Sequence, residues 1–127
     1  LVWALTAFTF PFGAAIAVLK DVPDVAGDRA FRIRTFSVRF GPRAVFRLAV
    51  GWLALAYLVM AAIGPALAGE ANVAVWVAGH LLALAALLWW ARAARPAEPR
   101  RFTPFYMRVW LLFFCEYALV ALAAVLA

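Results

Sequence analysis

Apolar residues form four long uninterrupted runs along this chain, and short polar stretches separate them. Each run is long enough to cross about 30 Å of hydrocarbon as a helix that rises about 1.5 Å per residue. Within lipid, only helices and closed barrels satisfy their backbone hydrogen bonds, and runs without polar alternation favour helices. The predicted spans are residues 1–19, 45–63, 73–91 and 109–127.

Glycine and proline mark the ends of these runs. Gly64-Pro65 and Gly69 predict a short turn after the second span, and Pro96 and Pro99 predict a loop after the third. Pro11 lies inside the first span, where it removes a helix hydrogen bond and predicts a kink.

Composition supports a membrane protein. The chain is 69% hydrophobic and 14% charged, whereas soluble domains are roughly 45–50% apolar and about 25% charged. The fold class is therefore all-α, a polytopic transmembrane helical bundle. The single cysteine, Cys115, excludes an internal disulfide. The net charge of +6 is explained better by the positive-inside rule than by binding to nucleic acid.

The basic residues predict the orientation of the bundle. All 12 Lys and Arg residues lie within residues 20–47 and 92–108, and the turn 64–72 has none. Because cytoplasmic loops are enriched in Lys and Arg, both basic segments are predicted to face the cytoplasm. The membrane is predicted to be a bacterial plasma membrane, with loop 20–44 on its cytoplasmic side.

Loop 20–44 mixes acid and base in a way that suits a magnesium–diphosphate site. Asp21, Asp24 and Asp28 are half of the chain's acidic residues. Mg²⁺ prefers carboxylate oxygens together with water and substrate phosphate. Lys20 and the nearby arginines would bind the remaining phosphate oxygens. The alternative is a solvated loop in which Asp24 or Asp28 caps a helix and the arginines hold lipid headgroups.

The same loop resembles a known motif. "KDVPDVAGDRAFRIRTFSVRFG" is similar to the second aspartate-rich motif of the UbiA superfamily of intramembrane aromatic prenyltransferases, and above all to homogentisate prenyltransferases. "GHLLALAALLWWARA", "FYMRVW" and "LFFCEY" resemble the last two helices of that family. The resemblance covers nearly the whole chain, in order.

The resemblance implies an activity and a set of residues. It implies a prenyltransferase that uses Mg²⁺ to transfer a prenyl group from a prenyl diphosphate to an aromatic acceptor. The expected acceptor is homogentisate, in prenylquinone or tocopherol biosynthesis. Asp21, Asp24 and Asp28 become the expected catalytic residues and metal ligands, and Lys20 and Arg34 the diphosphate contacts. Thr35 and Ser37 either donate hydrogen bonds to the substrate or cap the following helix.

Two departures from the family pattern limit the resemblance. Arg32 stands where the family usually has Gly, and it would either add a cation for the diphosphate or strain a turn. The family also has about nine helices and a first aspartate-rich motif. Residues 1–127 are therefore expected to be the C-terminal part of one integral membrane prenyltransferase domain, and the missing N-terminal half of the enzyme is an expected partner beside the substrates and the bilayer.

Other functions stay open at this point. Within the same class, the acceptor could be 4-hydroxybenzoate or a chlorophyll-type molecule. From other classes, the chain could be a non-catalytic membrane fragment, a piece of a transporter or an inactive remnant. Such proteins would carry charge in the loop without metal-dependent binding of a prenyl diphosphate.

Two ionisable residues lie inside the predicted spans, His80 in the third and Glu116 in the fourth. Ionisable groups at such depth usually face the protein interior. The antiparallel arrangement of consecutive spans favours a hydrogen bond between the two side chains, and a role with the aromatic substrate is the alternative.

Overall fold

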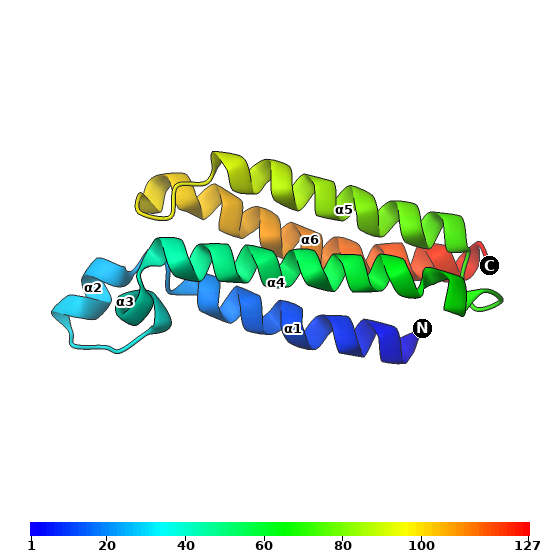
Figure 1. Cartoon of the computed structure of the whole chain (residues 1–127), viewed down its shortest axis with the longest axis horizontal. Coiled ribbons are helices and arrows are strands. Elements are labelled where there is room, and N and C mark those ends of the chain that lie inside the picture. Colours follow the sequence, from blue (N-terminus) through cyan, green and yellow to red (C-terminus); the bar gives the residue numbers. More distant parts are fainter.

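The computed structural model describes all residues from Leu1 to Ala127, and they are almost entirely helical (Figure 1). Four long helices are joined by a loop that holds two short helices and by two tighter connections. The elements are α1 (Val2–Lys20), α2 (Val25–Ala30), α3 (Phe36–Phe40), α4 (Pro42–Ile63), a 3₁₀ turn (Gly64–Leu67), α5 (Val73–Ala93) and α6 (Pro99–Val125). The all-α prediction is confirmed.

The four long helices run side by side as an antiparallel bundle (Figure 1). Helix α4 packs between α1 and α5, and α6 closes the bundle because it contacts both α5 and α1. At one end of the bundle, Asn72 ties two of the helices together. Its side-chain oxygen accepts a hydrogen bond from Val75 N–H at the start of α5, and its side-chain nitrogen donates to the carbonyl of Leu126 after α6.

An aromatic cluster fills the centre of the bundle between α1, α4 and α6. The ring centroids of Phe8 and Tyr57 are 5.2 Å apart, those of Phe12 and Tyr57 are 5.9 Å apart, and Phe12 lies 5.5 Å from Phe113. Aromatic pairs at such separations attract each other through their ring edges and faces as well as through burial. The contacts between these rings hold three helices of the bundle together.

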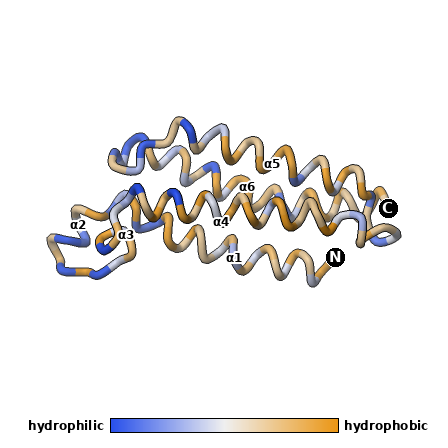
Figure 2. Tube along the Cα trace, in the orientation of Figure 1, coloured by the Kyte–Doolittle hydropathy of each residue, from blue (hydrophilic) through white to orange (hydrophobic).

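Large apolar side chains also cover the outside of the bundle, as expected of a membrane protein. Trp3 is 85% exposed and Phe10 is 82% exposed, which in water would be an unusual apolar surface. All four long helices have the length and composition needed to cross a membrane. Hydrophilic residues gather at the end of the bundle that carries α2, α3 and the α5–α6 connection (Figure 2).

The predicted spans agree with the observed helices, with one clear correction. The hydropathy pattern predicts that the fourth helix begins at residue 109, but α6 begins ten residues earlier. Its first residue is Pro99. Hydropathy detects only the apolar part of a helix, whereas arginines are good helix formers and proline is well tolerated in the first turn. The basic segment 92–108 is therefore mostly helical, and only the residues between Ala93 and Pro99 form the connection between α5 and α6.

Candidate functional site

The charged loop is built from two short helices that fold against the end of the bundle (Figure 1). Helix α1 ends at Lys20, just before the Val22-Pro23 pair, and proline cannot continue a helix. The chain then forms α2, an extended segment and α3. Gly41, with φ at +86°, turns the chain into α4, whose first residue is Pro42. A positive φ suits glycine because it has no side chain.

The three aspartates occupy different places in this loop. Asp21 follows the last residue of α1, and its carboxylate pairs with the Lys20 ammonium at 3.4 Å. The Asp28 carboxylate accepts a hydrogen bond from the Thr35 hydroxyl at 3.1 Å, which ties α2 to α3. Asp24 is exposed and stands at the N-terminus of α2, but its side chain makes no capping hydrogen bond. The capping alternative therefore does not hold for Asp24.

The chemistry of these donors fits a magnesium ion, although the side chains are not gathered into one cluster. No group of three acidic, histidine or cysteine side chains lies close enough together to hold a metal by protein ligands alone. Mg²⁺ does not require such a group, because it usually keeps several waters and takes one or two carboxylates plus substrate phosphate. Asp24, exposed and without a protein partner, has the donor type and accessibility that this binding mode needs.

A basic pocket of about 630 Å³ lies beside Asp28. Its walls are Arg34, Thr35, Phe36, Val38 and Arg39. Thr35 belongs to this wall and also hydrogen-bonds to Asp28, so the acidic and basic halves of the loop adjoin each other. The two arginines flank α3, one before it and one near its end. This arrangement can bind a polyanion through charge-assisted hydrogen bonds.

The pocket includes one residue that the sequence reasoning did not select. Arg34 was predicted to contact the diphosphate, and it lines the pocket, whereas Arg39 was not singled out. A signal was present in the sequence, because Arg39 follows Arg34 within the same short basic stretch. Lys20, the other predicted contact, does not line this pocket, and its ammonium pairs with Asp21 instead.

Thr35 and Ser37 have separate roles. The Thr35 hydroxyl accepts a hydrogen bond from Val38 N–H at 3.3 Å, so this residue caps α3, as one of the two sequence interpretations required. Ser37 is fully buried, and its hydroxyl has no hydrogen-bond partner.

Arg32 adopts a backbone conformation that favours glycine. Its φ is +57°, and its N–H donates to the Arg29 carbonyl while Ile33 N–H donates to the Asp28 carbonyl. This pair of hydrogen bonds is the Schellman motif, which ends a helix with a left-handed residue that is usually glycine. Of the two effects considered for this departure, the structure supports backbone strain, since Arg32 does not line the basic pocket.

A buried ionisable pair lies deep inside the bundle, as predicted. His80 and Glu116 are 0% and 2% exposed, and His80 Nε2 lies 2.9 Å from Glu116 Oε1. His80 Nδ1 is 2.7 Å from the Trp76 carbonyl oxygen. Because a carbonyl can only accept, Nδ1 carries a hydrogen, and a single proton lies between Nε2 and the carboxylate. The pair is therefore neutral as a whole, which suits its burial.

Further polar groups surround this pair without extending it to the loop. The Trp76 indole N–H donates to the Met60 carbonyl at 2.6 Å, so α5 is bonded to α4 as well as to α6. The Tyr57 hydroxyl is buried and has no hydrogen-bond partner. These contacts connect three helices, and a structural role for His80 and Glu116 follows from them.

Together these features define an integral membrane protein with a mixed acidic and basic loop at one end of a helical bundle. Residues 1–112 match the UbiA prenyltransferase family. The chain belongs to this family.

Curated relatives agree with this assignment. The chain is 41% identical over 122 residues to a homogentisate phytyltransferase of Synechocystis, which covers 96% of this chain and 40% of that protein. It is 43% identical over 116 residues to a homogentisate geranylgeranyltransferase of Triticum aestivum, covering 91% of this chain and 28% of that protein. The chain thus spans well under half the length of these relatives. No solved structure matches it.

Proposed function

We propose that this chain is part of a magnesium-dependent enzyme that transfers a prenyl group from a prenyl diphosphate to homogentisate. The observation that carries the proposal is that the half-buried Asp28 carboxylate adjoins, through its hydrogen bond with Thr35, a two-arginine pocket at one end of an apolar bundle. The names of the relatives support the same donor and acceptor, since they are homogentisate phytyl- and geranylgeranyltransferases. The remaining part of the site would come from the N-terminal half of the enzyme.

The loop residues would divide the work of binding the donor. Arg34 and Arg39 would hold diphosphate oxygens from two sides of α3. Asp21, Asp24 and Asp28 would hold Mg²⁺, which when bound neutralises charge on the diphosphate leaving group. Thr35 would keep the Asp28 carboxylate beside the basic pocket, because its hydroxyl donates to that carboxylate.

The orientation of the site follows from the basic residues. Both segments that contain Lys and Arg lie at the same end of the bundle (Figure 2). By the positive-inside rule this end would face the cytoplasm. The diphosphate head of the donor would then reach the loop from the aqueous side without crossing the bilayer. The apolar prenyl chain would stay in contact with the hydrocarbon of the membrane.

A chimera tests the proposal. This chain replaces the matching stretch of the Synechocystis homogentisate phytyltransferase, and membranes are assayed for prenylation of homogentisate. We expect activity that depends on Mg²⁺, and Asp24→Asn should lower turnover about a hundredfold, as loss of a group that stabilises developing charge typically does. Glu98→Gln is the matched control, since it removes an exposed carboxylate from the connection between α5 and α6.

Two outcomes would contradict the proposal. One is an Asp24→Asn chimera with the turnover and Mg²⁺ requirement of the parent chimera. The other is a parent chimera that inserts into membranes in normal amount but transfers no prenyl group from any donor.

A further inference from the structure

Residues 92–108, which end α5 and begin α6, carry positive charge that the chain itself does not balance. They contain five arginines and one acidic residue, Glu98. The Glu98 carboxylate lies 3.1 Å from Nε of Arg101, and no other arginine of this segment has an ion pair. The unpaired arginines are Arg92, Arg95, Arg100 and Arg108. Their charges can be neutralised only by anions that are not part of this chain.

Arg108 differs from the other three because an aromatic ring holds its guanidinium. Its Cζ lies 5.4 Å from the centroid of the Trp90 ring, so a residue of α5 supports a cation of α6. An indole ring attracts a cation more strongly than other aromatic rings do. A guanidinium that lies over a ring still has its edge free for two parallel hydrogen bonds to a phosphate. The Arg108 side chain is exposed, so an anion can reach that edge.

Arg108 stands where the polar part of α6 meets its apolar part. It is the last basic residue of the chain, and residues 109–125 of α6 would cross about 25 Å, most of the apolar layer of a bilayer. Trp89 of α5 is 67% exposed, and tryptophan is enriched at the boundary between headgroups and hydrocarbon. Arg108 therefore belongs at the level of the lipid phosphates.

One exposed stripe of α6 has the same order of groups as a phospholipid. Residues spaced three and four apart lie on the same face of a helix. This spacing aligns five exposed residues, which we call the α6 stripe: Arg101, Pro104, Arg108, Leu111 and Cys115. Both arginines lie in its polar half, and beyond Arg108 the stripe is apolar, with Leu111 53% exposed. A lipid whose phosphate is at Arg108 would extend its acyl chains along Leu111.

Helix α5, which packs against α6, presents the same order on an exposed side of its own. Arg92, Trp89, Ala85 and Leu82 are spaced by three or four residues, and all of them are exposed. Because α5 runs opposite to α6, Arg92 lies at the same end of the bundle as the arginines of the α6 stripe (Figure 2). The two neighbouring helices thus offer cations at one end and apolar surface next to them.

We propose that Arg108, supported by Trp90, binds the phosphate of an anionic phospholipid at the basic end of the bundle. One lipid phosphate matches one fixed guanidinium, and the acyl chains match the apolar half of the α6 stripe. The unpaired arginines favour a lipid with net negative charge, because the ammonium group of phosphatidylcholine would bring a further cation among them. The site lies outside loop 20–44, and binding of the lipid does not require prenyl transfer.

Lipid titration of the purified chimera tests the site. The chimera is titrated in mild detergent with phosphatidylglycerol at physiological salt, and bound lipids are counted by native mass spectrometry. Arg108→Gln removes the charge and keeps a polar side chain. Arg29→Gln is the matched control, because Arg29 is an exposed arginine without an ion pair on α2, which packs against α3.

The expected result is a selective loss of one lipid site. Arg108→Gln should weaken the tightest phosphatidylglycerol site about tenfold, the usual contribution of hydrogen bonds to a charged group. Trp90→Leu should weaken it about threefold, because a cation–π contact at an exposed site contributes about that much. Arg108→Lys should fall between the parent and Arg108→Gln, since lysine keeps the charge but not the planar donor pair. Arg29→Gln should leave the affinity within about twofold, because charges without direct contact are largely screened at this salt concentration.

A label on the lipid locates the site by a second measurement. Phosphatidylglycerol with a photoreactive group on its glycerol head should label α6 near Arg108 and the end of α5, and Arg108→Gln should reduce that labelling. Arg108→Lys gives the same comparison with the charge retained, so a glutamine variant that inserts poorly does not prevent the test. Neither measurement uses turnover, so an inactive chimera tests the site equally well.

Four results would overturn the inference. The first is equal affinity of the Arg108→Gln and Arg29→Gln variants for phosphatidylglycerol. The second is phosphatidylcholine binding that depends on Arg108 as strongly as phosphatidylglycerol binding does. The third is displacement of the bound lipid by millimolar inorganic phosphate, which would assign Arg108 to a soluble anion. The fourth is a label that falls mainly on α2 or α3, because the lipid would then be bound by the charged loop.

Discussion

The proton shared between His80 and Glu116 predicts an order of stability among substitutions at Glu116. His80 Nδ1 donates to the Trp76 carbonyl, so Nε2 needs a donor if the ring is neutral. A glutamine amide can donate to Nε2 and replace the protonated carboxyl. Glu116→Gln should therefore stay within about 1 kcal/mol of the wild type, the net value of one ordinary hydrogen bond.

Glu116→Leu should be more harmful, because it leaves a fully buried ring nitrogen without a partner. His80 is 0% exposed, so water cannot replace the lost carboxyl. The expected loss is about 2 kcal/mol, the usual penalty for one buried unsatisfied group. In membranes the coupling between polar partners is modest, so the double variant with His80→Leu should show a coupling of about 1 kcal/mol.

The assay is reversible unfolding of the chain in detergent by increasing SDS, followed by tryptophan fluorescence. Of the six tryptophans, Trp76 reports on the pair most directly, because its ring centroid lies 4.7 Å from that of His80; the other five are replaced by phenylalanine in the parent and in every variant. Equal stability of Glu116→Leu and the wild type would show that the pair contributes nothing. If Glu116→Gln were as unstable as Glu116→Leu, the shared proton would have to lie on His80 and not on Glu116, and the argument for a neutral ring would be refuted.

Three further predictions concern the loop, the packing and the orientation. Arg32→Gly should stabilise the loop by about 1 kcal/mol, because glycine tolerates the left-handed backbone conformation at the end of α2. Amide hydrogen exchange of residues 25–35 should then become slower, and an unchanged exchange rate would contradict backbone strain at Arg32. Gly79→Ala should lower the resistance of the chain to unfolding by SDS, because a Cβ there would overlap the Leu119 side chain and loosen α5 from α6. At Gly51 an added Cβ meets no atom, so Gly51→Ala should leave SDS resistance unchanged or raise it, and equal behaviour of the two variants would exclude close packing at Gly79. In a Cys115→Ala background, Ala97→Cys should react with an impermeant maleimide from the cytoplasmic side and Ala68→Cys from the opposite side, and the reverse pattern would overturn the orientation.

The candidate site was predictable from the sequence only in part. The loop's charge pattern and its family resemblance pointed to Asp21, Asp24, Asp28, Lys20 and Arg34, and their roles stay predictions. The sequence did not reveal that Thr35 bonds to Asp28 or that Arg39 shares a pocket with Arg34. Such contacts depend on the angle at which α3 packs against α2, and local sequence spacing does not define the angle between two helices.

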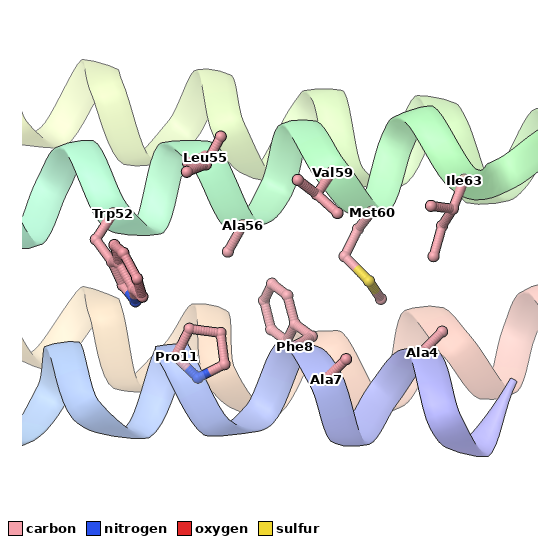
Figure 3. Close-up of a pocket in the computed structure, with 10 residues that line it drawn as sticks. All are labelled: Ala4, Ala7, Phe8, Pro11, Trp52, Leu55, Ala56, Val59, Met60 and Ile63. Carbon is pink, nitrogen blue, oxygen red and sulfur yellow. The ribbon is translucent and has the colours of Figure 1, made fainter.

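The lengths of the apolar runs and the positions of the basic residues were enough to predict the number of spans, their approximate bounds and the end of the bundle where the basic residues gather. Burying backbone in lipid requires a helix of a minimum length, so apolar run length alone carries that information. The tertiary structure decided which faces meet. His80 and Glu116 are 36 residues apart. The cavity between α1 and α4 is lined by Phe8, which points from α1 toward α4, and by Trp52, which points from α4 toward α1 (Figure 3). All-round apolar helices have no single buried stripe, so only their packing against one another selects these faces.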